Sequence, residues 1–171
     1  FVGRAGQLLR KELRKYPKVF KRTNCLITNL LGCRPKDNKF PTAGGSWTID
    51  FPTAGIIDFP TASGSWTIDL YAVVIRHCRD LWLFKEIELL KPKVIVTIGA
   101  QALEYVREDH GISDHRGSWK FLPKFKAWSF ATYHPSYVLR CQNDSNKSYV
   151  VEEFESDVRK LSETWHGIVS N

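Results

Sequence analysis

Short apolar segments that alternate with amphipathic ones constrain the fold of this chain most. Three segments are short and rich in apolar residues, as buried strands are: 25–28, 94–98 and 127–132. Apolar residues recur at spacings of three and four, as on one face of a helix, over three further segments: 5–16, 70–87 and 151–165. Gly99 follows the second strand and turns the chain into a short helix over 100–107. Strands that alternate with helices predict an α/β fold with three layers (α/β/α), in which helices cover both faces of a central parallel sheet.

Two polar residues follow predicted strands, at the end of the sheet where ligands bind. Asn29 comes directly after the first strand, and His134 follows the third. Ligands of parallel sheets bind beyond the carboxyl ends of the strands, so both residues are candidates for a site. Each has a structural alternative, because asparagine often occupies the turn that ends a strand. A histidine beside Pro135 can equally be hydrogen-bonded to the backbone, so the pattern alone leaves both interpretations open.

Positive charge is concentrated outside one segment of the chain. The net charge is +7, but segment 40–69 contains Asp50, Asp58 and Asp69 and no Lys or Arg, so the remainder carries +10. Basic side chains gain by displacing counterions from phosphates, so the charge is consistent with a nucleic-acid partner and equally with a merely solvated basic surface. Hydrophobic residues make up 43% of the chain and charged residues 25%. No apolar run approaches the roughly 18 residues of a membrane span, so we expect a soluble protein without a membrane partner.

Segment 40–69 is an internal repeat. The unit FPTAGGSWTID (40–50) is followed by FPTAGIID (51–58) and FPTASGSWTID (59–69). Each unit begins with a turn-prone PTA(G/S) stretch, and two contain a strand-prone Trp-Thr-Ile triplet. A solenoid would need at least three full units, and the middle one is incomplete. We therefore predict a surface excursion, such as a hairpin, that arose by local duplication rather than a working module.

The four cysteines do not form a recognisable ligand pattern by spacing. They are Cys25, Cys33, Cys78 and Cys141, and no two are separated by only two residues. The spacing matches neither a zinc ribbon nor a disulfide framework. An intracellular, cytoplasmic and reducing compartment is expected, with some of the thiols simply buried.

Five stretches together resemble the type 4, iron–sulfur-containing uracil-DNA glycosylases. In chain order they are FVGRAGQLL (1–9), LITNLLGCRP (26–35), LKPKVIVTIGAQAL (90–103), HRG (115–117) and TYHPSYVLR (132–140). They cover most of the chain outside the repeat. The resemblance implies a single domain over 1–171, with 40–69 as an insertion in it. It disfavours a generic nucleotide-binding domain, and TIGAQA (97–102) is indeed no G-x-G-x-x-G fingerprint.

The resemblance implies a DNA-repair hydrolase that removes uracil by cleaving its N-glycosidic bond and leaves an abasic site. A base inside a duplex must first be flipped into a pocket. Phe1 matches the residue that stacks on the base. Asn29 matches the residue that reads uracil, because one amide can pair with both the N3–H donor and the O4 acceptor of uracil but mismatches cytosine. His134 matches the donor to uracil O2, where negative charge builds as the bond breaks. Asn29 and His134 are thus the expected catalytic residues.

The resemblance also implies which residues contact DNA. The stretch that contains Pro135, Ser136, Tyr137 and Arg140 resembles the family's DNA-intercalating loop, and Arg116 belongs to the HRG stretch. The expected partner is uracil-containing DNA, single- or double-stranded, bound by a monomer.

Three departures from the family affect these expectations. In the family, a strand and the loop GEAPG, whose acidic group positions the hydrolytic water, precede FVGRAG, whereas this chain begins at Phe1 and contains no Met. We therefore expect a truncated front, the first strand missing and reduced activity, with a non-catalytic nucleic-acid-binding domain of the same fold as the alternative. Cys33 and Cys78 match two of the four ligands of a 4Fe-4S cluster, which would be incomplete or absent in this chain. The repeat separates these two cysteines, and Cys25 and Cys141 match no ligand.

Overall fold

The computed structural model describes residues 3–21, 24–30, 47–51, 55–59 and 75–169. These residues fall into two compact units. The first consists of Phe1–Ile27 together with Leu90–Asn171, and the second of Thr28–Leu89. Phe1, Cys33 and Asp69, the expected N-cap of the helix predicted over 70–87, lie outside the described residues.

The first unit is built on a three-stranded sheet. Its strands are β3 (Val94–Ile98), β4 (Trp119–Leu122) and β5 (Ala127–Thr132), in the order β3-β5-β4. β3 and β5 are parallel, with Val96 opposite Phe130, whereas β4 is antiparallel to β5. The α/β class is therefore confirmed, and in the described residues the sheet is mixed rather than wholly parallel. The reason is the tight turn at 123–126, which returns the chain directly beside β4 without the crossover that a parallel neighbour requires.

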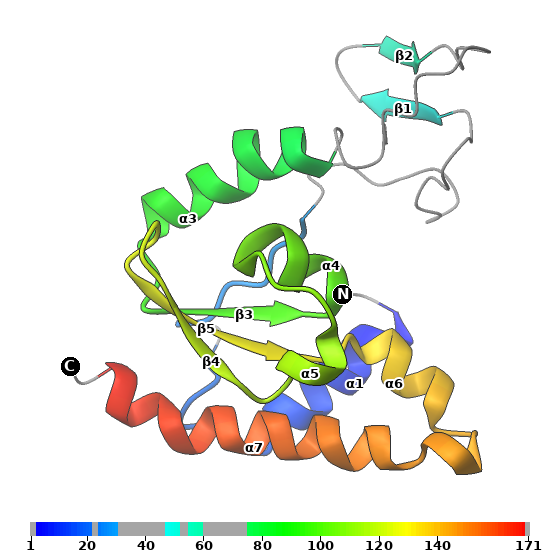
Figure 1. The fold of residues 1–171 in the computed structure, drawn as a ribbon, viewed down its shortest axis with the longest axis vertical. Coiled ribbons are helices and arrows are strands. Elements are labelled where there is room, and N and C mark those ends of the chain that lie inside the picture. The colour runs from blue at the N-terminus through cyan, green and yellow to red at the C-terminus, as the bar shows by residue number, and fades with distance from the viewer. Residues whose placement is uncertain (1–2, 22–23, 31–46, 52–54, 60–74, 170–171) are drawn as a thin grey trace. The chain divides into compact units, whose positions relative to one another are not determined.

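Helices lie on both sides of this sheet. The longer ones are α1 (Arg4–Leu13), α6 (Pro135–Cys141) and α7 (Tyr149–Val169), and the short segments are α4 (Ala100–Ala102), η3 (Leu103–Arg107), α5 (Ile112–His115) and η4 (Ser145–Lys147). Figure 1 shows α1, α6 and α7 together on one side of the sheet and α4 on the other. The predicted helices at 5–16, 100–107 and 151–165 are thus confirmed, as is the layered arrangement.

The hydrophobic core of this unit lies where α1, α6 and α7 meet. Leu9 of α1 packs with Val138 of α6 and with Phe154 and Val158 of α7, and all four side chains are at most 3% exposed. The predicted apolar stripe of the last helix is the face that makes these contacts. Cys141 is buried in the same cluster, as its apolar surroundings would favour for a thiol without a ligand role.

The predicted strand at 25–28 is wrong. These residues form no strand, and Leu26 and Ile27 are 62% and 48% exposed. Just before them the side chain of Asn24 accepts the N–H of Lys21 and donates to the carbonyl of Val19, which closes a turn. A strand needs a neighbouring strand to satisfy its backbone groups, and none in the described part of the chain pairs with this segment.

The second unit contains a helical segment and a hairpin. Helix begins within the described residues at 75–78 and continues through η2 (Arg79–Leu83) into α3 (Phe84–Leu90), which confirms the prediction for 70–87 over its described part. β1 (Trp47–Phe51) and β2 (Gly55–Phe59) form an antiparallel pair with Ile49 opposite Ile57, so the described part of the repeat consists of the two strands of a hairpin. No helix in the described ranges is long and apolar enough to cross a membrane.

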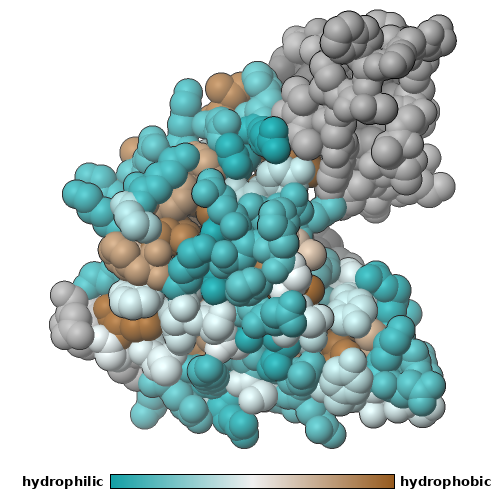
Figure 2. Space-filling view, viewed as in Figure 1, coloured by the Kyte–Doolittle hydropathy of each residue, from teal (hydrophilic) through white to brown (hydrophobic). Residues whose placement is uncertain are grey.

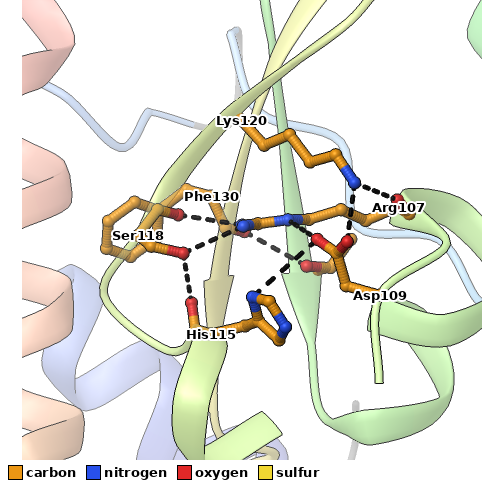
Figure 3. A network of polar contacts seen from close by, with 7 residues as sticks. Arg107, Asp109, His115, Ser118, Lys120 and Phe130 are labelled. Carbon is orange, nitrogen blue, oxygen red and sulfur yellow. Dashed lines mark hydrogen bonds and ion pairs between the residues drawn. The ribbon is translucent and has the colours of Figure 1, made fainter. Parts of the chain in front are cut away.

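A polar network fixes the segment between η3 and β4 (Figure 3). Arg107 is 4% exposed, and its Nε lies 2.6 Å from Asp109 while its other nitrogens donate to the carbonyl and hydroxyl of Ser118. Lys120 Nζ lies 2.6 Å from the second oxygen of Asp109. Burial opposes ionisation of Asp109, but the hydrogen bonds from Lys120 and Arg107 outweigh it and hold its pKa below the ordinary value. The charges of this network are therefore paired with one another.

Candidate active site

His134 lies at the carboxyl end of β5, where the chain passes into α6. It is the N-cap of that helix, with extended backbone (φ −73°, ψ 132°), and its Nδ1 accepts the backbone N–H of Ser136 at 3.1 Å. Pro135 occupies the first turn, where the missing N–H costs no hydrogen bond. The sequence His-Pro-Ser thus starts a helix and fixes the imidazole at the same time.

The same contacts determine the protonation of His134. Because Nδ1 accepts a hydrogen bond, the single proton of the neutral imidazole is assigned to Nε2. Burial lowers the pKa of His134, and the positive charge of Arg140 lowers it further. The side chain is therefore a neutral group at pH 7 whose Nε2–H is a donor, the form that can stabilise an oxyanion without acting as an acid.

Gly99 allows β3 to approach His134 closely. Its N–H donates to the carbonyl of Thr132 at 2.8 Å, which ties the end of β3 to the end of β5. A Cβ on Gly99 would lie only 2.8 Å from the Cβ of His134, and the φ of +94° disfavours any L side chain. The sequence predicts only a turn at Gly99, because its close approach to His134 joins two segments that are distant in the chain.

Asp157 of α7 holds the end of β5 from the other side. Its carboxylate, only 2% exposed, accepts the hydroxyl of Thr132 at 2.8 Å and the Nε of Arg116 at 3.0 Å. Burial raises the pKa of Asp157, and the hydrogen bonds from Arg116 and Thr132 oppose that effect. Thr132 precedes His134 by two residues, so this carboxylate positions the strand end that carries the histidine. No sequence signal pointed to Asp157, which lies on the inner face of a helix.

Arg116 is directed towards α7. Its guanidinium also donates to Glu153, from Nη1 to the carboxylate at 3.1 Å and from Nη2 to the backbone carbonyl at 2.8 Å. The central carbon of the guanidinium lies 5.6 Å from the ring centre of Tyr133. All three nitrogens therefore have partners inside the protein. This arrangement favours a structural role for Arg116 over the predicted contact with DNA.

Comparison with known proteins shows the family to which this chain belongs. The family model described as the uracil DNA glycosylase superfamily matches residues 1–158. The chain belongs to the uracil-DNA glycosylase superfamily. The resemblance of the five sequence stretches to this family is thereby confirmed.

Three curated relatives of this superfamily member have the same name. A protein of Thermotoga maritima named "Type-4 uracil-DNA glycosylase" is 29% identical over 164 residues, which are 91% of this chain and 65% of the relative. Proteins with the same name from Sulfurisphaera tokodaii and Archaeoglobus fulgidus are each 28% identical, and the matches cover 96% and 95% of this chain. The chain spans 62% and 66% of the length of those two relatives.

The remaining residues of the predicted DNA-contacting stretch differ in exposure. Pro135 is buried, and Ser136 and Tyr137 are half-buried. The centre of the Tyr137 ring lies 5.3 Å from that of Tyr133. The pKa of Tyr137 is raised, mainly by a side-chain hydrogen bond with Cys141 and further by burial. Arg140 is exposed, with its guanidinium 5.8 Å from the Tyr137 ring. Arg140 is thus the exposed member of this stretch.

The other predicted site residues belong to the second unit or lie outside the described ranges. Asn29 is exposed, lies outside regular secondary structure and belongs to the second unit, whereas His134 belongs to the first. Phe1 and Cys33 are not described. Cys78 is half-buried at the end of the helical segment 75–78. Among the described residues, no three His, Cys, Asp or Glu side chains gather as a metal site would require, so these residues alone do not fit a cluster.

Proposed function

We propose that the protein is a uracil-DNA glycosylase of DNA base-excision repair, a hydrolase of N-glycosyl bonds. The observation that carries this proposal is His134, a neutral imidazole fixed at the carboxyl end of β5 with its proton on Nε2. Superfamily membership and the shared name of the relatives support it. The same observations disfavour the alternative of a non-catalytic nucleic-acid-binding domain.

In the proposed reaction, the target uridine is flipped out of the DNA and enters the site beside β5. The bond between C1′ and uracil N1 breaks, its electron pair moves onto uracil, water adds its hydroxyl group to the sugar carbon, and the proton that the water loses neutralises the uracil anion. Negative charge builds on uracil O2 during this step. The Nε2–H of His134 donates to that oxygen, and because Ser136 and the Gly99 approach already fix the imidazole, little reorganisation is needed in the transition state.

Base recognition is assigned to the residues that the sequence predicted. The amide of Asn29 pairs with N3–H and O4 of uracil and so rejects cytosine, and the ring of Phe1 stacks on the base. Arg140 contacts a backbone phosphate of a DNA substrate, single- or double-stranded, with Ser136 beside it. We propose that the protein acts as a monomer and as a single domain with 40–69 inserted.

We propose a 4Fe-4S cluster only for a protein that provides all four thiolate ligands. Cys33 and Cys78 would supply two thiolates, and four are required. The cluster would stabilise the fold around these cysteines. Visible absorbance and iron content of the purified protein test this assignment, and a protein without iron, with Cys78→Ser no less stable than the parent, would refute it. An intracellular location stays a prediction.

Uracil release from single- and double-stranded oligonucleotides tests the proposed activity. It is measured with the protein itself, alongside His134→Ala and Asn29→Asp. We expect His134→Ala to slow release by about 10²–10³-fold, as removal of an oxyanion donor does, and Asn29→Asp to reduce discrimination against cytosine. A protein that binds DNA but releases no uracil would disprove the proposal, and unchanged base selectivity in Asn29→Asp would exclude Asn29 as the reader.

A further inference from the structure

The hairpin of β4 and β5 exposes two aromatic rings at the end distant from His134. Phe121 and Trp128 are directly opposite each other in the strand register, with ring centres 5.4 Å apart in an edge-to-face arrangement. They are 45% and 40% exposed. On the same face of the hairpin the next pair, Trp119 and Phe130, is 4.9 Å apart, and Phe130 is completely buried. The exposed pair is therefore followed along the hairpin by a pair that is anchored through the buried Phe130.

Four exposed lysines lie in the segments next to these two rings. Lys124 and Lys126 lie in the hairpin turn, and Lys91 and Lys93 lie just before β3. The carbonyl of Lys93 accepts the N–H of Trp128 at 3.0 Å, which brings this second pair of lysines beside the tryptophan. We call Lys91, Lys93, Phe121, Lys124, Lys126 and Trp128 the lysine–aromatic patch. In Figure 2 hydrophobic surface is visible over the turn that joins β4 and β5, with hydrophilic residues beside it.

Negative charge is absent from the segments that form the patch. Residues 90–103 and 118–131 contain no Asp or Glu. Lys120 alternates with Trp119 and Phe121 along β4, so its side chain lies on the other face of the hairpin, where it contacts Asp109, and it is not part of the patch. These two segments therefore contribute positive charge without any negative charge of their own, which is complementary to a polyanion.

The patch is separate from the proposed uracil site. Trp128 stands near the beginning of β5, and His134 follows its end. A strand of this length spans about 17 Å. None of the patch residues contributes to the positioning of His134 through Gly99, Thr132 or Asp157.

We propose that the lysine–aromatic patch binds single-stranded nucleic acid, as a second contact independent of the base being excised. Two exposed rings offer stacking faces for successive bases, and lysines on both sides of Trp128 offer charges for the phosphates between them. This combination of stacking platforms and a basic track is how proteins bind single strands without reading sequence. The proposal does not depend on uracil hydrolysis, because binding here needs neither uracil nor His134.

Fluorescence anisotropy with a labelled 12-residue oligothymidylate tests the proposal. An abasic oligonucleotide of the same length provides the phosphates without bases, and an oligoglutamate provides charge alone. Trp128→Leu should weaken binding of oligothymidylate about tenfold and leave binding of the abasic oligonucleotide unchanged. Lys124→Glu with Lys126→Glu should weaken binding of both and reduce the salt dependence by about 1.4 in the logarithmic slope.

Matched controls separate the patch from general effects. Trp82→Leu replaces another exposed tryptophan (69% exposed) of the described chain, and Lys11→Glu with Lys18→Glu makes the same change of charge on exposed residues elsewhere. Both controls should bind like the parent. Equal losses in patch and control variants would overturn the proposal, as would binding of oligoglutamate as tight as that of oligothymidylate, which would indicate an acidic protein partner. Since the two turn lysines are exposed, their double variant decides the outcome even if Trp128→Leu does not fold.

Discussion

At the scale of single residues, the neighbours of His134 set its charge. Burial and Arg140 both lower its pKa below the ordinary 6.5. Arg140→Gln should therefore raise the pKa of His134 back towards that value, because it removes the positive charge of Arg140 and leaves the effect of burial unchanged. Titration of the imidazole by NMR in the DNA-free protein measures this shift directly.

Arg159→Gln serves as the control for that titration, because Arg159 is an exposed arginine on α7 that contacts Ser156. It should leave the His134 titration unchanged. The folded pKa of His134 lies below the unfolded one, so protonation favours the unfolded chain, and this contribution to stability is lost as pH falls below about 6.5. An unchanged titration in Arg140→Gln would show that Arg140 does not act on the imidazole.

Gly99 gives a second prediction for a single residue. Gly99→Ala introduces a Cβ 2.8 Å from that of His134 at a φ of +94°, so either β3 or the histidine must move. We expect a loss of stability on the order of 1–3 kcal/mol, the usual cost of a strained backbone position, and a shifted His134 signal in the NMR spectrum. Gly167→Ala is the matched control, because open space surrounds Gly167 within α7 and alanine should stabilise the helix there. If both variants were equally stable, the close approach of β3 would not constrain the site.

At the scale of elements, α7 holds the end of β5 through Asp157, whose charge is paired with that of Arg116. Breaking a buried ion pair by removal of one partner costs about 3–5 kcal/mol, and Asp157 is 2% exposed. Arg116→Met should therefore lower the free energy of unfolding by roughly 3 kcal/mol in urea titrations. Arg116→Lys should lower it too, because an ammonium group cannot reproduce the paired contacts of the guanidinium with Asp157 and Glu153.

The lysine variant also decides between the two roles of Arg116. If Arg116 contacted a DNA phosphate, Arg116→Lys would retain stability and most of the DNA affinity while Arg116→Met would lose affinity alone. The structural role predicts the opposite, a loss of stability in both variants, with any loss of DNA affinity following the fraction that remains folded. Arg159→Met, which removes an exposed arginine from the same helix, controls for helix propensity.

Elements with a strong local pattern were predictable from the sequence, and those that depend on tertiary partners were not. β3 and β5 are short apolar runs and α7 has a helical periodicity, so their positions followed from the chain alone. β4 was not predicted, because it is four residues long and is defined by its pairing with β5. The strand predicted at 25–28 was wrong, because an apolar run forms a strand only where a neighbouring strand pairs with it, and composition does not show whether one does. Asp157 was missed because Arg116 and Thr132, its partners, are 41 and 25 residues away.

At the scale of the whole molecule, charge and the repeat are distributed unequally. The three aspartates of 40–69 reduce a charge of +10 on the remainder to a net +7. The lysine–aromatic patch and Arg140 both belong to the first unit, whereas the repeat belongs to the second. Any contribution of the repeat to DNA binding would therefore oppose the phosphate-binding charge rather than add to it.

Deletion of 40–69 tests whether the repeat is a passive insertion. In the described residues β1 and β2 pair only with each other and not with the strands of the first unit. The deletion removes about two thirds of the connection between Leu30 and Ile75, and the shorter loop should favour folding by about 1 kcal/mol. Urea unfolding should thus show unchanged or slightly higher stability, and DNA affinity at low salt should rise with the net charge. A deletion variant that unfolds more easily would mean that the repeat contributes packing of its own, because loop entropy alone can only stabilise the shortened chain.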